Sequence, residues 1–157
     1  MWTRSFIIST ALNLGDLDYV TNRLLRNPAD FADVLRPLYG NEIALRFENL
    51  FTDHLLIAAN LVNAAKAGDT KMVDEERKKW YANADDISRF LSEINPYWSK
   101  RNWQTMLYEH LQMTEKEAVQ ILTEQYEESI AEYDSIEKQA LKMGDDMAYG
   151  IIKQFQI

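Results

Sequence analysis

The sequence predicts an all-α protein folded as an up-and-down antiparallel helical bundle of four long helices plus shorter ones. Apolar side chains recur every three or four residues along most of the chain, which is the period of an amphipathic helix. Glycine and proline contribute only 5 and 3 of the 157 residues. No segment of useful length alternates in the β-period, and short connections between long helices favour antiparallel neighbours. We therefore expect a single domain over residues 1–157.

The N-terminal part of the chain is predicted to form three shorter helices. Apolar residues at helical spacing indicate the first over 2–14, and a Gly-Asp pair separates it from a second over 17–25. Asn27 and Pro28 then resemble an N-cap followed by a proline at the first helical position. The third helix is expected to run from there to a stop at Gly40.

The long helices follow. The segment 41–67 carries one apolar stripe whose members are spaced alternately four and three residues apart: Ile43, Phe47, Leu50, His54, Ile57, Leu61 and Ala64. A second long helix is expected from Gly68-Asp69 to Asn95-Pro96, and a shorter one over 97–112. The sequence Thr114 to Glu117 has the form of a capping box, which predicts that the last long helix begins there.

A spacing of 56 residues aligns two parts of the chain without a gap. Asn27, Asp30, Leu35, His54 and Leu55 meet identical residues at this shift, which is five identities in 29 positions. Helix caps and periodicity account for several of these matches. The only two histidines of the chain nevertheless coincide. We interpret the pattern as an internal duplication, with repeat-like halves at about 17–67 and 73–123.

His54 and His110 are the candidate functional residues, because both lie on the apolar face of their helices. Neutral imidazole is the commonest metal ligand, and helical bundles build metal sites from inward-facing histidines and carboxylates. The Glu-x-x-His pattern of di-iron bundles is absent, since Phe51 and Leu107 stand three positions before the two histidines. A divalent-metal site of the Fe, Zn or Mn type at His54 and His110 would therefore need a further ligand.

Two other interpretations of the histidines stay open. Both rings can be structural, with their nitrogens bonded to tyrosine hydroxyls, of which the candidates are Tyr39, Tyr108, Tyr126 and Tyr133. Acid–base catalysis is the third interpretation. The sequence has no recognisable catalytic motif, so whether the protein is an enzyme is left undecided. A ligand pocket among Trp80, Trp98 and Trp103 is an alternative to the core role that aromatic residues at helical spacing usually have.

Composition narrows the classes of partner. The formal net charge of −8 argues against binding to nucleic acid or to an anionic membrane surface. No glycine-rich phosphate loop is present, so no nucleotide is expected. The absence of cysteine excludes disulfides and thiol chemistry. No apolar run approaches a membrane span. We expect a cytoplasmic protein, with self-association through the apolar face of the first helix as one mode of assembly.

Several short stretches spread over the whole chain form a distinctive combination. They are Trp2-Thr3-Arg4, Asp16-Leu17-Asp18, Asn22-Arg23-Leu24-Leu25, Asn27-Pro28-Ala29-Asp30, Ala64-Ala65-Lys66-Ala67, Trp80-Tyr81-Ala82-Asn83, Ile94-Asn95-Pro96-Tyr97-Trp98 and Tyr133-Asp134. Together they resemble a family of small bacterial all-helical proteins of unknown function, some of which carry the automatic label acetylglutamate kinase. That label conflicts with the sequence, since an amino-acid kinase needs an α/β sheet with glycine-rich loops.

The resemblance also implies a third histidine. Similar proteins begin with a His-Val-x-Trp-Thr-Arg stretch, which would place a histidine upstream of residue 1, about 55 residues before His54. The expectation is therefore a set of three repeat-related histidines, of which this chain holds two. Such a set is similar to the metal sites of DinB-like and ferritin-like bundles, and this likeness is an analogy of fold.

Overall fold

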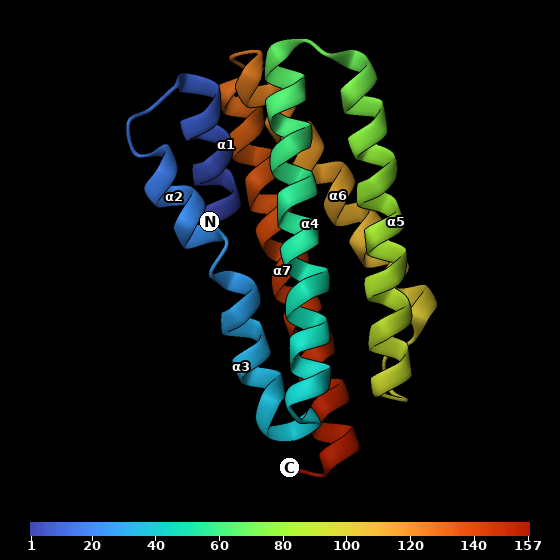
Figure 1. Ribbon diagram of the computed structural model, residues 1–157. Helices are drawn as coiled ribbons and strands as arrows, with labels where there is room; N and C mark the ends of the chain where they lie inside the picture. Colours follow the sequence, from blue (N-terminus) through green and yellow to red (C-terminus); the bar gives the residue numbers. More distant parts are fainter.

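The computed structural model describes residues 1–157 and consists of seven α-helices without a strand (Figure 1). The all-α bundle is therefore confirmed. In chain order the helices are α1 (Trp2–Leu12), α2 (Leu17–Leu24), α3 (Asn27–Tyr39), α4 (Asn41–Ala67), α5 (Thr70–Ile94), α6 (Lys100–Leu122) and α7 (Tyr126–Phe155).

The four long helices, α4 to α7, alternate in direction, and each packs against the next (Figure 1). Local sequence explains where they begin and end. Gly68 ends α4 in the left-handed conformation, with φ of 72°. The Asp69 side chain then caps α5 by accepting a hydrogen bond from the Met72 amide at 3.0 Å. Asn95 is extended and ends α5 before Pro96, which cannot continue a helix.

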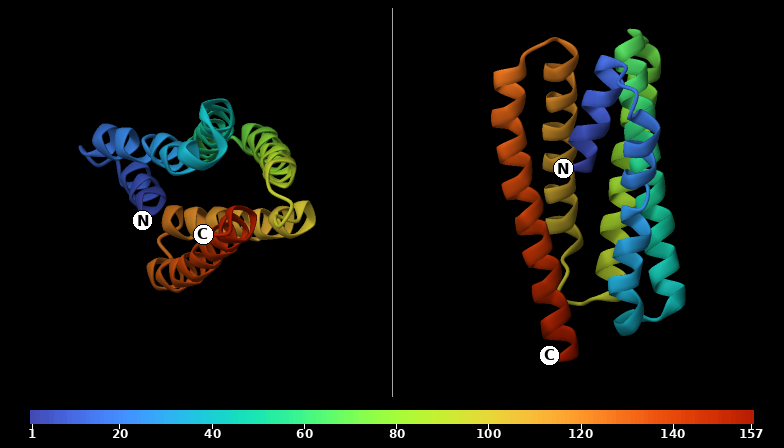
Figure 2. Two further views of the ribbon diagram at one scale, coloured as in Figure 1. Left: turned by 90° about the horizontal axis from the view of Figure 1, so that it is seen from below. Right: turned by 90° about the vertical axis from the view of Figure 1, so that its left-hand side faces the viewer.

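The three short helices cover one side of the bundle (Figure 2). Helix α3 packs along α4, and α1 contacts α2, α4 and α6. The apolar side chains Phe6 and Ile7 of α1 are buried together with Leu55, Val62 and other residues of α4 and α6. Phe6 and Ile7 are thus covered within the chain, whereas Leu12 and Leu14 are exposed, and self-association through the first helix stays a prediction.

The predicted start of the last helix at Thr114 is wrong. Helix α6 continues to Leu122, and the chain turns at Glu124, whose φ is 60°. Thr114 and Glu117 do not cap a helix, because both are buried in the interior of α6. The carboxylate of Glu117 instead pairs with the Arg4 guanidinium of α1. A buried ion pair between distant segments thus produced a local sequence pattern that resembles a capping box.

The spacing of 56 residues relates two consecutive helical hairpins. Thr70 and Tyr126, the first residues of α5 and α7, are 56 positions apart. The same shift carries α4, which ends at Ala67, onto α6, which ends at Leu122. By residue number the shift of 56 thus pairs the hairpin α4–α5 with α6–α7, and His54 with His110. The internal duplication, with halves at about 17–67 and 73–123, stays a prediction.

Two glycines in α7 are expected to respond in opposite ways to replacement by alanine. A Cβ at Gly150 would overlap the buried indole of Trp98, whose N–H donates to the Asp146 carbonyl at 3.3 Å. Gly150→Ala should therefore lower the free energy of unfolding by about 1–3 kcal/mol. A Cβ at Gly144 meets no atom within 4 Å. Gly144→Ala should raise the free energy of unfolding by about 0.5–1 kcal/mol, as is usual in a helix interior.

Urea denaturation of the two glycine variants measures both effects on one helix. Each variant is the control for the other, because the change in helix propensity is the same at both positions. Equal stabilisation by both alanines would show that the indole of Trp98 moves aside without lowering the free energy of unfolding. That result would contradict the close approach of α7 to Trp98.

Candidate functional site

His54 and His110 line the same cavity inside the bundle. Its volume is about 240 Å3, and all of the helices except α2 contribute to its wall. The lining is mostly apolar and aromatic, and includes Phe31, Phe47, Phe51, Leu55, Trp80, Ile87, Leu91, Trp103, Leu107, Met143 and Met147. Besides the two histidines, the side chains with polar groups in the wall are Thr3, Asn27, Thr114 and the indole N–H groups of Trp80 and Trp103. The structure therefore brings together the two residues that the sequence singled out.

The His54 ring is held by an amide from the neighbouring helix. Its Nδ1 lies 2.7 Å from Oδ1 of Asn83 on α5, and the Asn83 amide nitrogen donates to the Leu50 carbonyl at 3.0 Å. A carbonyl can only accept, so the amide nitrogen of Asn83 must face Leu50 and its oxygen must face the ring. Nδ1 of His54 therefore carries the proton, and Nε2 keeps its lone pair.

His110 is held by the same arrangement one hairpin later. Its Nδ1 lies 2.9 Å from Oε1 of Gln139 on α7, and the Gln139 amide nitrogen donates to the Met106 carbonyl at 2.7 Å. In both hairpins the accepting carbonyl is four residues before the histidine. Both rings are thereby fixed in the tautomer with the free lone pair on Nε2, an arrangement that also orients histidines at metal sites.

The partners of the two histidines are Asn83 and Gln139, and not the tyrosines that the sequence suggested. The hydroxyl of Tyr39 donates to Gln154 at 2.8 Å and that of Tyr108 donates to Asp85 at 2.8 Å. One signal was present, because Asn83 and Gln139 are themselves 56 positions apart. This match is not an identity, because the first residue is an asparagine and the second a glutamine.

Burial keeps both imidazoles neutral. Removal from water and, to a smaller extent, repulsion from His110 lower the pKa of His54 to about 4, against the opposing effect of the hydrogen bond to Asn83. The pKa of His110 is also lowered, again chiefly by burial. At neutral pH the site thus presents two uncharged rings, each with an Nε2 acceptor, to a largely apolar space.

Carboxylates are absent from the cavity wall. Asp53 and Glu109, which each precede a histidine by one residue and are therefore offset from it by about 100° around the helix, are exposed. Glu117 is paired with Arg4. No group of three or more histidine and carboxylate side chains is arranged to hold a metal ion. The two histidines are thus the only nitrogen ligands that the chain itself offers at this cavity.

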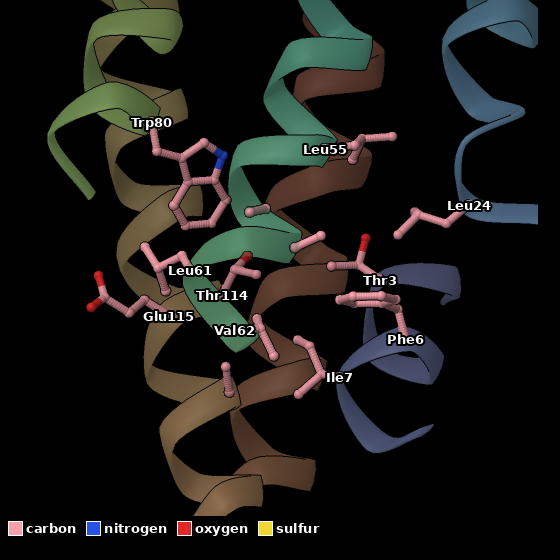
Figure 3. Close-up of a pocket in the computed structure, with 13 residues that line it drawn as sticks. Thr3, Phe6, Ile7, Leu24, Leu55, Leu61, Val62, Trp80, Thr114 and Glu115 are labelled. Atoms are coloured by element: carbon pink, nitrogen blue, oxygen red, sulfur yellow. The ribbon is translucent and has the colours of Figure 1, made fainter. Parts of the chain in front are cut away.

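A smaller cavity of about 20 Å3 adjoins the first, beneath α1 (Figure 3). Leu55, Ala58, Trp80, Thr114 and Thr3 belong to the walls of both cavities. A space of this size holds about one water molecule. Trp80 is tilted against His54, with ring centroids 5.4 Å apart, so the two cavities meet beside the His54 ring.

Compared with protein-family models, with curated proteins and with solved structures, the chain matches none of them. The seven helices also lack the combination of length and apolar character that crossing a membrane requires. The properties of the site therefore carry the functional argument.

Proposed function

We propose that this protein binds a compact, mostly apolar organic molecule in the cavity between His54 and His110. The observation that carries the proposal is the pair of Nε2 acceptors, each fixed by its own amide, in the wall of a single apolar cavity. A hydrogen-bond donor on the ligand would meet one of these acceptors. The apolar wall would bury the rest of the molecule, which is the usual composition of a small-molecule site.

The size of the cavity limits the ligand. A dry apolar cavity of about 150 Å3 already takes benzene. The cavity here is about 240 Å3, which suits a bicyclic ring system. Ligand entry is favoured between α3 and α7, because Phe31 of α3 and Ala140 and Gly144 of α7 line the cavity and are exposed to solvent.

Charge favours a neutral ligand over a free cation. Two uncharged imidazoles do not offset the charge of a buried divalent ion, and the cavity wall holds no carboxylate. Burial of an uncompensated charge is costly. A neutral molecule with an N–H or O–H donor avoids this cost.

Metal binding is a second candidate function, and one specific observation favours it. In a histidine that binds a metal through one ring nitrogen, the N–H of the other ring nitrogen usually donates to a group that orients the ring. The Nδ1–H groups of His54 and His110 donate to such groups, the amide oxygens of Asn83 and Gln139. A zinc ion bound by these two Nε2 atoms would need further ligands and compensating negative charge. Both would have to come from groups that do not belong to the cavity wall.

The donor requirement can be tested with two isosteric probes. Indole carries an N–H donor, whereas benzofuran has an oxygen at the same place and cannot donate. We expect indole to bind about tenfold more tightly than benzofuran in titration calorimetry, because one buried acceptor is satisfied only by indole. The double variant His54→Asn/His110→Asn should lose this preference, since asparagine keeps a donor near the Nδ1 position and lacks Nε2.

Controls separate a binding effect from a folding effect. Asp53→Asn changes an exposed neighbour of His54 and should leave the indole preference intact. Urea denaturation shows whether the double variant is folded at the temperature of the titration. Equal affinity of wild-type protein for the two probes would overturn the proposal, as would an indole preference that survives in the double variant.

The same proteins test the metal candidate. Zinc chloride is titrated into tag-free wild-type protein, and the metal content is measured after gel filtration. One equivalent of zinc that is lost in both single variants, His54→Asn and His110→Asn, would support the metal site. Less than about a tenth of an equivalent in the wild-type protein would rule out this candidate for the chain.

A further inference from the structure

Trp80 presents a buried donor that no group in the protein satisfies. Its side chain is 3% exposed, and its Nε1 has no hydrogen-bond partner. Figure 3 shows the indole nitrogen on the side of the ring that faces Leu55, away from Leu61 and Val62. Leu55 belongs to the wall of the large cavity, and Leu61 and Val62 do not. Trp80 itself lines the large cavity, where its ring lies beside that of His54, with centroids 5.4 Å apart.

Thr114 adds a second unsatisfied group at the same level. It is 6% exposed, its Oγ1 has no partner, and it lines both cavities. It lies four residues after His110, and therefore on the same face of α6. An unmade hydrogen bond at a buried donor costs about 1–3 kcal/mol. Both groups line the small cavity as well as the large one, so they point to a polar occupant, a water molecule or a ligand, at the place where the two cavities meet.

The polar groups gather at one end of the cavity. His54 and Phe47 on α4, Trp80 and Ile87 on α5, and His110 and Trp103 on α6 are each seven residues apart. Seven residues span about 10 Å of helix. Because α5 runs antiparallel to α4 and α6, the two histidines and Trp80 share one level, and Phe47, Ile87 and Trp103 share another (Figure 1). We call the end of the cavity with both histidines, beneath α1, the polar end. The opposite end, where Trp103 contributes an indole N–H but no acceptor, is called the apolar end.

From this we infer that the ligand carries an amide-like group, in which a donor N–H and an acceptor oxygen are attached to the same carbon, at the polar end of the cavity. Its N–H donates to a histidine Nε2, and its carbonyl oxygen accepts from Nε1 of Trp80. Its apolar body extends toward Trp103. The inference rests on the proposed binding function and deepens it, since it defines the chemical class as neutral cyclic or primary amides attached to an apolar ring.

The probe pair indole and oxindole tests the acceptor. Oxindole is indole with a carbonyl placed beside the N–H, so it offers both a donor and an acceptor. We expect oxindole to bind the wild-type protein about tenfold more tightly than indole. Trp80→Phe keeps an aromatic ring and removes the N–H, so it should reduce this ratio to about one.

Trp103→Phe is the matched control, because it makes the same exchange at the apolar end of the same cavity. It should weaken both probes to a similar extent and leave their ratio at about ten. If Trp80→Phe unfolds, the N–H resonance of Trp80 in the wild-type protein is a second measurement. This resonance should shift downfield with oxindole and stay nearly unchanged with indole.

The possible failures are distinguishable. The proposed function itself is overturned if indole binding does not depend on the histidines, or if neither probe binds. The inference alone is overturned if indole binding depends on the histidines while the oxindole ratio is unchanged in Trp80→Phe. An oxindole ratio that falls equally in Trp103→Phe would also overturn it, because the effect would then reflect cavity shape.

Discussion

Replacement of Arg4 by methionine is expected to lower the free energy of unfolding by about 3–5 kcal/mol, the usual cost of breaking a buried ion pair from one side. Arg4 pairs with Glu117, whose side chain is 2% exposed, and donates to the Ser129 carbonyl at 3.0 Å. Burial raises the pKa of Glu117, and the Arg4 guanidinium opposes this rise. Without Arg4 the Glu117 carboxylate must remain charged without a partner or take up a proton.

Urea denaturation of Arg4→Met at pH 7 checks this result. The control is Arg46→Met, which removes an exposed pair with Glu93 at 3.3 Å and should cost less than about 1 kcal/mol. The double variant Arg4→Met/Glu117→Leu should recover much of the loss, because no charge is then buried alone. A loss in Arg4→Met no larger than that in Arg46→Met would contradict the buried pair.

Acid is expected to destabilise the protein through His54. The pKa of His54 is about 4 in the folded protein, below the ordinary value of 6.5. The unfolded chain therefore binds a proton that the folded chain excludes, and the free energy of unfolding falls as the pH drops from about 6.5 to about 4. By linkage the loss between pH 7 and pH 5 is about 2 kcal/mol from His54 alone. The lowered pKa of His110 adds a loss of the same sign.

The histidine contribution is isolated by comparison with a variant that cannot titrate at this position. His54→Asn and the wild-type protein share every other ionisable group, so the difference between their pH profiles reports His54. We expect the profile of His54→Asn to be flatter by about 2 kcal/mol between pH 7 and pH 5. Parallel profiles of the two proteins would show that the His54 ring is not buried as a neutral base.

Most of the fold could be predicted from the sequence, because the residues that begin and end its helices act on the backbone next to them. Gly40, Gly68 and Asn95-Pro96 end helices through their own backbone preferences, and they do so in the structure. The failure at Thr114 has a different origin. The partner of Glu117 is Arg4, which is 113 residues away in the sequence. A pattern of neighbouring residues cannot reveal a contact between such distant positions.

The site was readable in part. Helical periodicity placed His54 and His110 on interior faces, and the structure places both on one cavity. Their amide partners lie on the neighbouring helix, so they depend on the packing of α4 against α5 and of α6 against α7. The unsatisfied N–H of Trp80 is also a property of packing, because it depends on which groups are missing around the ring.

The contact between Gly150 and Trp98 has a consequence for the register of the longest helix. A slide of α7 along its axis by one turn would bring Asp146 or Gln154 to the place of Gly150, and either side chain would collide with the buried indole. Helix α7 is therefore held at one axial position. The depth at which Met143 and Met147 enter the cavity is set by that position. A glycine that does not line the cavity thus helps to determine the shape of the space between the two histidines and α7.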